Sequence, residues 1–204
     1  MRLVVIGAGG HAKVVVDAAR AAGIDVLAAV GDPAGARTVL GVPVVATLEE
    51  VEADGFIAAI GDNRARAEAF DAARRRGLTP VTVIHPSAAV APSATIGSGT
   101  FVAAGVVVNP EACIGQNAIL NTSCSVDHDC AIGDHVHVAP GVRLCGGAKV
   151  GPGALLGVGS AVIPGVSIGA WAVVGAGAAV LEDVPDGATF AGVPARDLHP
   201  EEPR

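Results

Sequence analysis

The sequence predicts a small α/β domain of Rossmann type, half the size of the complete fold, followed by a parallel β-helix of hexapeptide repeats. Three observations support this fold class. A short apolar run near the N-terminus leads through a glycine-rich turn into an alanine-rich segment, and branched aliphatic residues recur at every sixth position from residue 84 to residue 180. Aromatic residues are scarce, with four Phe, one Trp and no Tyr. Hexapeptide repeats are typical of a parallel β-helix, and Val, Ile, Leu and Ala suit its narrow core.

The first 83 residues alternate predicted strands and helices. We expect strands at 3–6, 26–30 and 56–60, and helices at 12–22 and 64–76, each helix closed by a glycine. Alternating strands and helices joined by short turns imply a small parallel sheet. We therefore assign residues 1–83 to an α/β domain.

A glycine turn links the first predicted strand to the first helix. Gly7, Gly9 and Ala12 fit the pattern G-x-G-x-x-G/A, and Asp32 lies where a ribose-binding acid would be expected. A domain of this length forms only half of a doubly wound fold, so a whole dinucleotide has no room. Backbone N–H groups at a glycine-rich helix start still bind phosphate, which predicts a nucleoside diphosphate. A tight turn without a ligand is the alternative.

The six-residue period defines the second domain, residues 84–185, before a C-terminal tail at 186–204. If each hexad is numbered from its aliphatic residue, position 5 is mostly small and position 2 is often glycine, as at Gly97 and Gly115. We expect position 5 to point into the core and the glycines to provide the positive φ angle of a sharp corner. Three hexads should close one triangular coil, so that residues eighteen apart lie above one another.

Polar side chains are concentrated at residues 121–137 of the predicted coil. His128 is flanked by Asp127 and Asp129. A neutral imidazole can accept a proton from an attacking amine, and an adjacent carboxylate can fix its tautomer. Gly146 follows His128 by eighteen residues. Stacking should therefore bring a backbone N–H close to the imidazole, where it could stabilise a developing oxyanion.

Composition excludes several classes of protein. The net charge of −7 argues against a nucleic-acid partner held by bulk charge. The apolar runs are too short for a membrane span, and Met1 leads directly into a strand, so we expect a cytoplasmic chain. The four cysteines are not spaced as zinc ligands; Cys124 and Cys130 fall at position 5 and are expected to be packing thiols. No metal site is predicted.

Both predicted domains resemble bacterial nucleotide-sugar N-acetyltransferases, above all those that act on UDP-4-amino sugars. The motifs that resemble the family are Gly-Gly-His at 9–11, Asn-Thr-Ser at 121–123 followed by His128-Asp129, and Gly-x-Pro-Ala-Arg at 192–196. The resemblance implies a left-handed coil and a homotrimer with active sites between subunits. It also implies acetyl-CoA as co-substrate, with no permanently bound cofactor.

The resemblance also implies roles for individual residues. For the nucleotide-linked amino sugar these are Gly9, Gly10 and His11 near the phosphates, Asp32 on the base, and Asp62 and Asn63 after the third strand. In the coil, His128 would be the general base, Asp129 its orienting carboxylate and Gly146 the oxyanion donor. For acetyl-CoA the residues are His137 from a neighbouring subunit, Gly146, and Arg196 near the phosphates. Gly157 and Gly175 would line a groove for the pantetheine arm, although spacing alone favours narrow corners. His135 receives no role.

The predicted reaction is direct transfer of an acetyl group from acetyl-CoA to the amine of a nucleotide-linked sugar, with a UDP-4-amino-4,6-dideoxy sugar as the expected acceptor. One alternative keeps the fold and acetylates a hydroxyl, as in sialic-acid O-acetyltransferases. A second is a metal-dependent hydratase of carbonic-anhydrase type that uses His128, His135 and His137. That hydratase would leave the N-terminal domain and the Gly-x-Pro-Ala motif unexplained. The polar cluster around His128 disfavours a non-catalytic scaffold.

Overall fold

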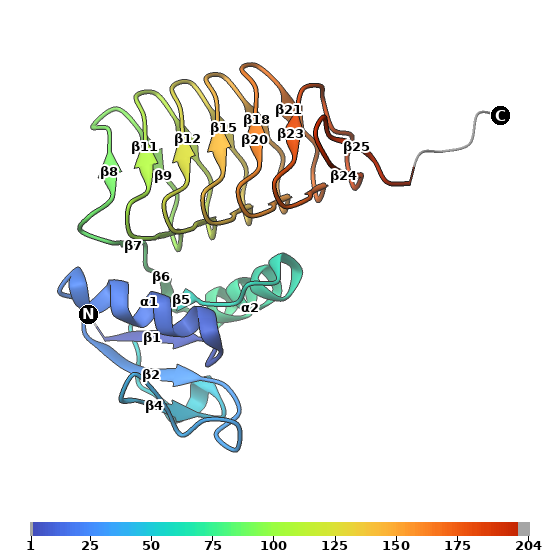
Figure 1. The fold of residues 1–204 in the computed structure, drawn as a ribbon. Helices are drawn as coiled ribbons and strands as arrows, with labels where there is room; N and C mark the ends of the chain where they lie inside the picture. The colour runs from blue at the N-terminus through green and yellow to red at the C-terminus, as the bar shows by residue number, and fades with distance from the viewer. Residues whose placement is uncertain (1, 200–204) are drawn as a thin grey trace.

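The computed structural model describes residues 2–199, so that 200–204, the end of the predicted tail, lie outside the described residues. An α/β domain lies against one side of a long coil of short parallel strands, as Figure 1 shows. The predicted fold class is confirmed. Among the described residues, no helix has the length and apolar character needed to cross a membrane.

The N-terminal domain is built on a six-stranded sheet. The strand order is β3-β4-β2-β1-β5-β6, and every pair is parallel except the β3–β4 hairpin. The strands are β1 (Leu3–Ile6), β2 (Val26–Val30), β3 (Thr38–Val39), β4 (Val42–Val45), β5 (Gly55–Ala58) and β6 (Thr79–Pro80). The helices are α1 (Gly10–Ala21), α2 (Asn63–Arg75) and the 3-10 turn η1 (Leu48–Glu50). The sequence did not predict β3, β4 and β6, because β3 and β6 are only two residues long and proline interrupts β4 and β6, so that no period can be recognised.

Side chains of the central strands alternate between two apolar clusters. Leu3 and Val5 of β1 pack with α1, whereas Val4 and Ile6 pack with Phe70 of α2. The two helices therefore cover opposite faces of the sheet, which explains why β1 is apolar throughout.

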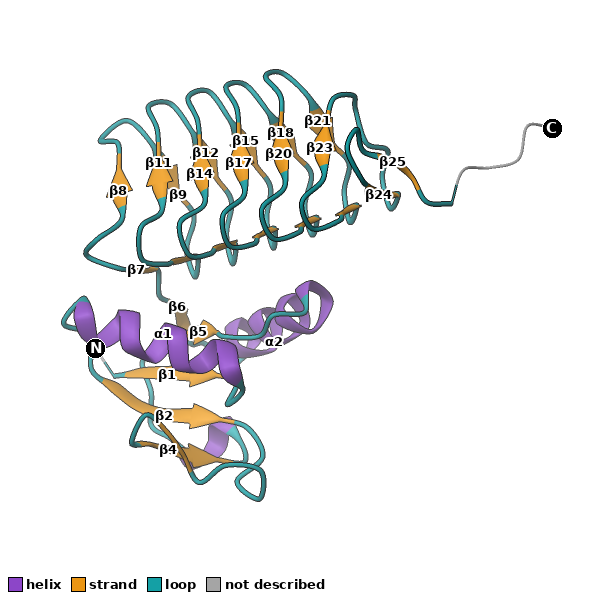
Figure 2. Cartoon of the chain, in the orientation of Figure 1, coloured by secondary structure: helices purple, strands orange, loops and turns teal. Residues whose placement is uncertain are grey.

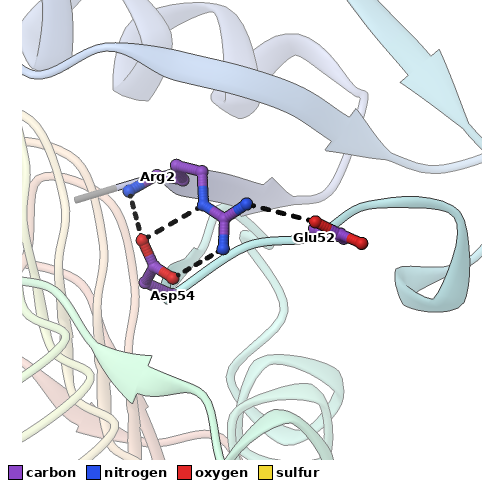
Figure 3. Close-up of polar contacts among 3 residues, drawn as sticks. All are labelled: Arg2, Glu52 and Asp54. Atoms are coloured by element: carbon purple, nitrogen blue, oxygen red, sulfur yellow. Dashed lines mark hydrogen bonds and ion pairs between the residues drawn. The ribbon is translucent and has the colours of Figure 1, made fainter.

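Just before β1, Arg2 forms hydrogen bonds with Asp54 and Glu52 (Figure 3). The bonds from Arg2 lower the pKa of the Asp54 carboxyl to about 2.

The coil consists of three parallel sheets whose strands are almost all two residues long (Figure 2). The first sheet contains β7 (Val83–Ile84), β10 (Phe101–Val102), β13 (Ile119–Leu120), β16 (His137–Val138), β19 (Leu155–Leu156), β22 (Val173–Val174) and β24 (Thr189–Ala191), with β25 (Arg196–Asp197) antiparallel at its end. The second contains β8 (Ala89–Val90), β11 (Val107–Val108), β14 (Ser125–Val126), β17 (Arg143–Leu144), β20 (Ala161–Val162) and β23 (Ala179–Val180). The third contains β9 (Thr95–Ile96), β12 (Cys113–Ile114), β15 (Ala131–Ile132), β18 (Lys149–Val150) and β21 (Ser167–Ile168).

The core of the coil follows the sequence pattern. Paired strands place residues eighteen apart opposite one another, as in Leu120 with Val138 and Val126 with Leu144. Position 1 points inward in every hexad from Val102 to Val180, and these four residues are 0 % exposed. Cys124 and Cys130 are buried as expected, and burial raises the pKa of the Cys124 thiol to about 12.

The expected role of the corner glycines was wrong. Positive φ angles occur at position 4 of the hexad, without a break from Gly99 to Gly177, and not at the position-2 glycines. Position 2 is glycine because successive coils approach too closely for a side chain. A β-carbon at Gly115 would lie 2.6 Å from the backbone nitrogen of Asp134, and one at Gly97 would lie 2.4 Å from the carbonyl carbon of Gly115. Strands of neighbouring coils are only about 4.8 Å apart, which leaves no room there for a β-carbon.

Candidate active site

The carboxyl ends of β1, β2 and β5 meet at one edge of the N-terminal sheet. A depression of about 320 Å³ lies there, lined by residues that include Gly7, Gly9, Gly31 and Asp32. Gly7 has a φ of 124°, and a β-carbon would lie 2.6 Å from the carbonyl oxygen of Ala59. A β-carbon at Gly31 would lie 2.5 Å from that of Ala8. Close packing of the three strand ends therefore requires these glycines.

The start of α1 faces this depression. Gly9 is the N-cap of the helix, no side chain caps it, and Gly10 is the first helical residue. The uncapped N–H groups are suited to phosphate oxygens. Asp32 accepts a hydrogen bond from the Ala34 N–H at 2.9 Å, which shapes the loop beyond β2. The glycine turn and Asp32 thus lie together, as the sequence predicted.

The two residues assigned after β5 differ in their surroundings. Asp62 caps α2 by accepting from the Ala65 N–H at 2.8 Å, and it borders a 160 Å³ pocket between α2 and the coil. Asn63 is 8 % exposed, and its amide donates to the carbonyls of Gly153 and Ala154 at 2.9 and 3.0 Å. The Asn63 side chain therefore joins the two domains, a contact that the sequence analysis did not foresee.

Two histidines lie at the boundary between the domains. The His11 ring is 5.5 Å from the ring of Phe101 and 6.4 Å from that of His137, between centroids. His137 Nε2 is 3.1 Å from the Asn121 amide nitrogen, and its Nδ1 is 3.4 Å from the Gly61 carbonyl oxygen. Burial, with a smaller effect of nearby Arg66, lowers the pKa of both histidines to about 4.

Both rings are therefore neutral at pH 7. Within residues 2–199, His11 Nε2 has no hydrogen-bond partner although it is buried. Asn121 received no individual role from the sequence, although it begins the Asn-Thr-Ser motif. That motif was the available signal for its contact with His137.

The catalytic candidates lie at the corner between the second and third sheets, in the loop from β14 to β15. His128 Nδ1 is 2.7 Å from Asp129 Oδ2, and both side chains are about two-thirds exposed, at 68 % and 65 %. Asp127 turns to a different partner and accepts from the Asn109 amide at 2.8 Å. Of the two flanking carboxylates, Asp129 is thus the one that contacts the imidazole, through Nδ1.

Gly146 lies against the His128 ring, as the eighteen-residue spacing predicted. A β-carbon at Gly146 would come within 2.6 Å of both Cε1 and Nε2 of the imidazole. Among residues 2–199, the Gly146 N–H donates to no protein acceptor, whereas the next N–H, of Gly147, bonds to the His128 carbonyl at 2.9 Å. The corner therefore combines an imidazole with a backbone N–H that has no acceptor among the described residues.

The remaining coenzyme A candidates lie in the later coils and the tail. Arg196 of β25 forms an ion pair with Glu182 at 2.9 Å. A β-carbon at Gly157 would lie 2.6 Å from the Ala176 nitrogen, and one at Gly175 would lie 2.7 Å from the Ala191 β-carbon. Close stacking of the coils thus accounts for both glycines. Their contact with acetyl-CoA stays a prediction.

The three histidines proposed as ligands in the hydratase alternative occupy different parts of the coil. His128 lies at the corner between the second and third sheets, and His137 on the outer face of the first sheet. His135 lies at the corner between the third and first sheets, with Nδ1 2.8 Å from the Asn117 amide nitrogen. In the described part of the chain, no group of three or more His, Cys, Asp or Glu residues could hold a metal ion.

Within one chain, the catalytic candidates lie apart from the candidate nucleotide edge, which is the edge of the N-terminal sheet where β1, β2 and β5 end. The N-terminal domain covers the first sheet of the coil, next to β7 (Figure 1). The β14–β15 loop belongs to the opposite corner of the triangular coil. His128 and His11 therefore do not meet within a single chain.

Comparison with known proteins identifies the family. Residues 2–73 match the model of the PglD N-terminal domain. Among solved structures, the chain is 47 % identical in sequence to a histidine-to-asparagine mutant of perosamine N-acetyltransferase from Caulobacter crescentus. That structure contains CoA and GDP-perosamine. It matches with a TM-score of 0.94 over 98 % of each chain. The chain belongs to the nucleotide-sugar N-acetyltransferases.

Other solved structures of the family agree. The acetyltransferase domain of PglB from Neisseria gonorrhoeae, solved with acetyl coenzyme A, is 38 % identical, with a TM-score of 0.90 over 97 % of this chain and 98 % of that one. WeeI from Acinetobacter baumannii is 27 % identical, with a TM-score of 0.87 over 97 % of this chain and 100 % of that one. No curated protein matched the chain. The fold is the family's N-terminal α/β domain and left-handed parallel β-helix, and the chain is an acetyl-CoA-dependent N-acetyltransferase.

Proposed function

We propose that the chain transfers the acetyl group of acetyl-CoA to the amine of a nucleotide-linked amino sugar, with His128 as general base. The observation that supports this most is the arrangement of His128 between the Asp129 carboxylate and the Gly146 backbone. It provides a proton acceptor whose tautomer is fixed, beside a donor for a developing negative charge.

The reaction proceeds by direct attack. The amine nitrogen forms a bond to the thioester carbonyl carbon, while His128 Nε2 takes a proton from that nitrogen. The Gly146 N–H stabilises the oxyanion of the tetrahedral intermediate, and Asp129 stabilises the imidazolium. The carbon–sulfur bond then breaks, and His128 returns the proton to the departing coenzyme A sulfur, so that the products are an amide and a free thiol.

A complete site requires a second copy of the chain. The nucleotide edge and His128 lie on opposite sides of the coil, so we propose that His128 of one protomer serves the acceptor held by its partner. A triangular coil with one such contact at each protomer suits the homotrimer that the resemblance to the family implies. His137, on the face next to the nucleotide edge, would then line the shared site. His11 and Gly61 border the same region.

Two acceptors are the leading candidates. GDP-perosamine comes first, because the 45 % to 47 % identical structures from Caulobacter crescentus contain it. A UDP-4-amino-4,6-dideoxy sugar is the second, because the motifs at 9–11 and 121–129 resemble those of enzymes that act on UDP-4-amino sugars. Four free cysteines suit a reducing compartment, which supports the cytoplasm as the place of the reaction.

The experiment is thiol release from acetyl-CoA with each acceptor, comparing the native enzyme with His128→Ala. We expect rapid release with one of the two acceptors and its loss in the variant, while acetyl-CoA still binds. Substantial turnover by His128→Ala would exclude the general-base role. A product that hydroxylamine cleaves would indicate an ester and a hydroxyl acceptor, and the absence of release with any amino sugar would overturn the proposal.

A further inference from the structure

The guanidinium of Arg66 is a buried cation without an acidic partner. Arg66 lies in α2, it is 0 % exposed, and within residues 2–199 no carboxylate lies in ion-pair distance of it. Burying a charge is costly unless hydrogen bonds satisfy it. Burial lowers the pKa of Arg66 only to about 10, so the group remains charged at pH 7.

Oxygen atoms from both domains satisfy this cation. The acceptors are the carbonyls of Ile60 (3.0 Å) and Gly61 (3.4 Å) after β5, the carbonyls of Asn117 (3.1 Å) and His135 (2.7 Å) in the coil, and the Asn63 side-chain oxygen (2.8 Å). One planar group therefore ties the loop at the nucleotide edge to two successive coils. An apolar side chain could fill the same space but could not fix these positions relative to each other.

Most of the coil residues that contact α2 form a single row. Gly99, Asn117, His135, Gly153 and Trp171 lie eighteen residues apart at the same corner position, and all have positive φ angles. At the first position of this row, Phe70 would contact a β-carbon at Gly99. Arg66 bonds to the next two residues, Asn117 and His135. Asn63 bonds to Gly153, and the Arg64 guanidinium lies 4.4 Å from the centroid of the Trp171 ring.

Residues 63, 66 and 70 share one face of the helix, so α2 lies along the corner in a defined register. The coil acceptors of Arg66 and Asn63 are backbone carbonyls, which recur in every coil, so the side chains along the row set the register. A slip of one coil would bring Phe70 against Asn117 in place of Gly99, where even a β-carbon would lie 2.5 Å from the Phe70 ring. The row thus specifies where along the coil the N-terminal domain sits, and the bonds of Arg66 and Asn63 hold it there.

This register affects the proposed site directly. Gly61, whose carbonyl accepts from Arg66, also lies 3.4 Å from His137 Nδ1. We propose that Arg66, supported by Asn63, is a positioning residue that sets the nucleotide edge against the coil and so places the acceptor amine for acetyl transfer. The inference rests on the proposed function.

The test separates binding at each site from the geometry between the sites. Arg66→Met removes the five donors, and Arg66→Lys retains the charge but not the planar fork. Arg75→Met, at an exposed position of the same helix, is the matched control. Calorimetry measures the Kd of coenzyme A and of the free nucleotide, and steady-state kinetics measures kcat/KM for the acceptor.

We expect Arg66→Met to lower kcat/KM on the order of 100-fold, because a small misplacement of reacting groups has an effect of that size. Both Kd values should stay within about twofold, and Arg66→Lys should be intermediate. Trp171 is the only tryptophan, so its fluorescence reports on this interface; it should shift to longer wavelength in Arg66→Met but not in Arg75→Met.

Unchanged kcat/KM in Arg66→Met would overturn the inference, and so would a parallel loss of affinity for both ligands. If Arg66→Met does not fold, Asn63→Ala serves as the test. It should lower kcat/KM for the acceptor roughly tenfold with both Kd values nearly unchanged, and a native kcat/KM would overturn the inference. The turnover of the native enzyme tests the proposed function, whereas the ratio of variant to native tests the role of Arg66, so the two failures are distinguishable.

Discussion

The imidazole of His128 lies so close to Gly146 in the following coil that a β-carbon there would come within 2.6 Å of Nε2. Gly146→Ala must therefore push the ring away from its place beside Asp129. We expect kcat to fall on the order of 100-fold, as for removal of an oxyanion donor, with the Kd of acetyl-CoA nearly unchanged. Lys149→Ala, at an exposed position of the next strand, is the control. Native kcat in Gly146→Ala would show that the contact is not part of catalysis.

The two carboxylates beside His128 should differ in their importance. Asp129 contacts Nδ1 at 2.7 Å, whereas Asp127 bonds to Asn109. Asp129→Asn keeps the shape and tolerates the φ of 61° at this position, but it removes the charge that stabilises the imidazolium. We expect kcat to fall roughly 10- to 100-fold in Asp129→Asn and to stay near native in Asp127→Asn. Steady-state kinetics with saturating acetyl-CoA measures both, and equal losses would reject Asp129 as the orienting group.

The sequence predicted the coil well because its signal repeats. Each hexad has a branched aliphatic residue at the same inward position, and the eighteen-residue period determines which residues stack. The contact between His128 and Gly146 could therefore be predicted from their separation in the sequence. The chemistry at the corner was equally local, since His128 and Asp129 are neighbours in sequence. The N-terminal glycine turn could be predicted because its residues are also neighbours in the sequence.

Contacts between the domains could not be predicted from the sequence. No period relates residues of α2 to the coil, so the burial of Arg66 and the use of Asn63 at the interface have no signature in the sequence. The position-2 glycines were misread because the sequence shows that a glycine is required but not whether φ or close packing requires it. Asn121 was seen as part of a motif, but its contact with His137 depends on how the domains pack.

Arg196 should contribute to acetyl-CoA binding through its charge. In the structure it pairs with Glu182, and both side chains are more than half exposed, at 62 % and 57 %. We expect Arg196→Ala to raise the KM for acetyl-CoA roughly fivefold at low salt, with a smaller effect at high salt. Glu182→Gln should have the opposite effect, since it releases the guanidinium for the coenzyme A phosphates. If neither substitution changes this KM, the C-terminal motif does not contact the donor.

Acid should destabilise the interface around His11 and His137. Their pKa values are lowered from 6.5 to about 4, mainly by burial, so between these two values the unfolded chain binds more protons than the folded one. Stability is therefore complete above pH 6.5 and falls as the pH decreases towards 4, by up to about 3 kcal/mol for each histidine. Urea unfolding at constant protein concentration measures this loss, and His11→Asn combined with His137→Asn should reduce its pH dependence. His199→Gln, at an exposed position near the C-terminus, is the control and should leave the dependence unchanged. A double variant with the native pH dependence would mean that other groups dominate the acid response.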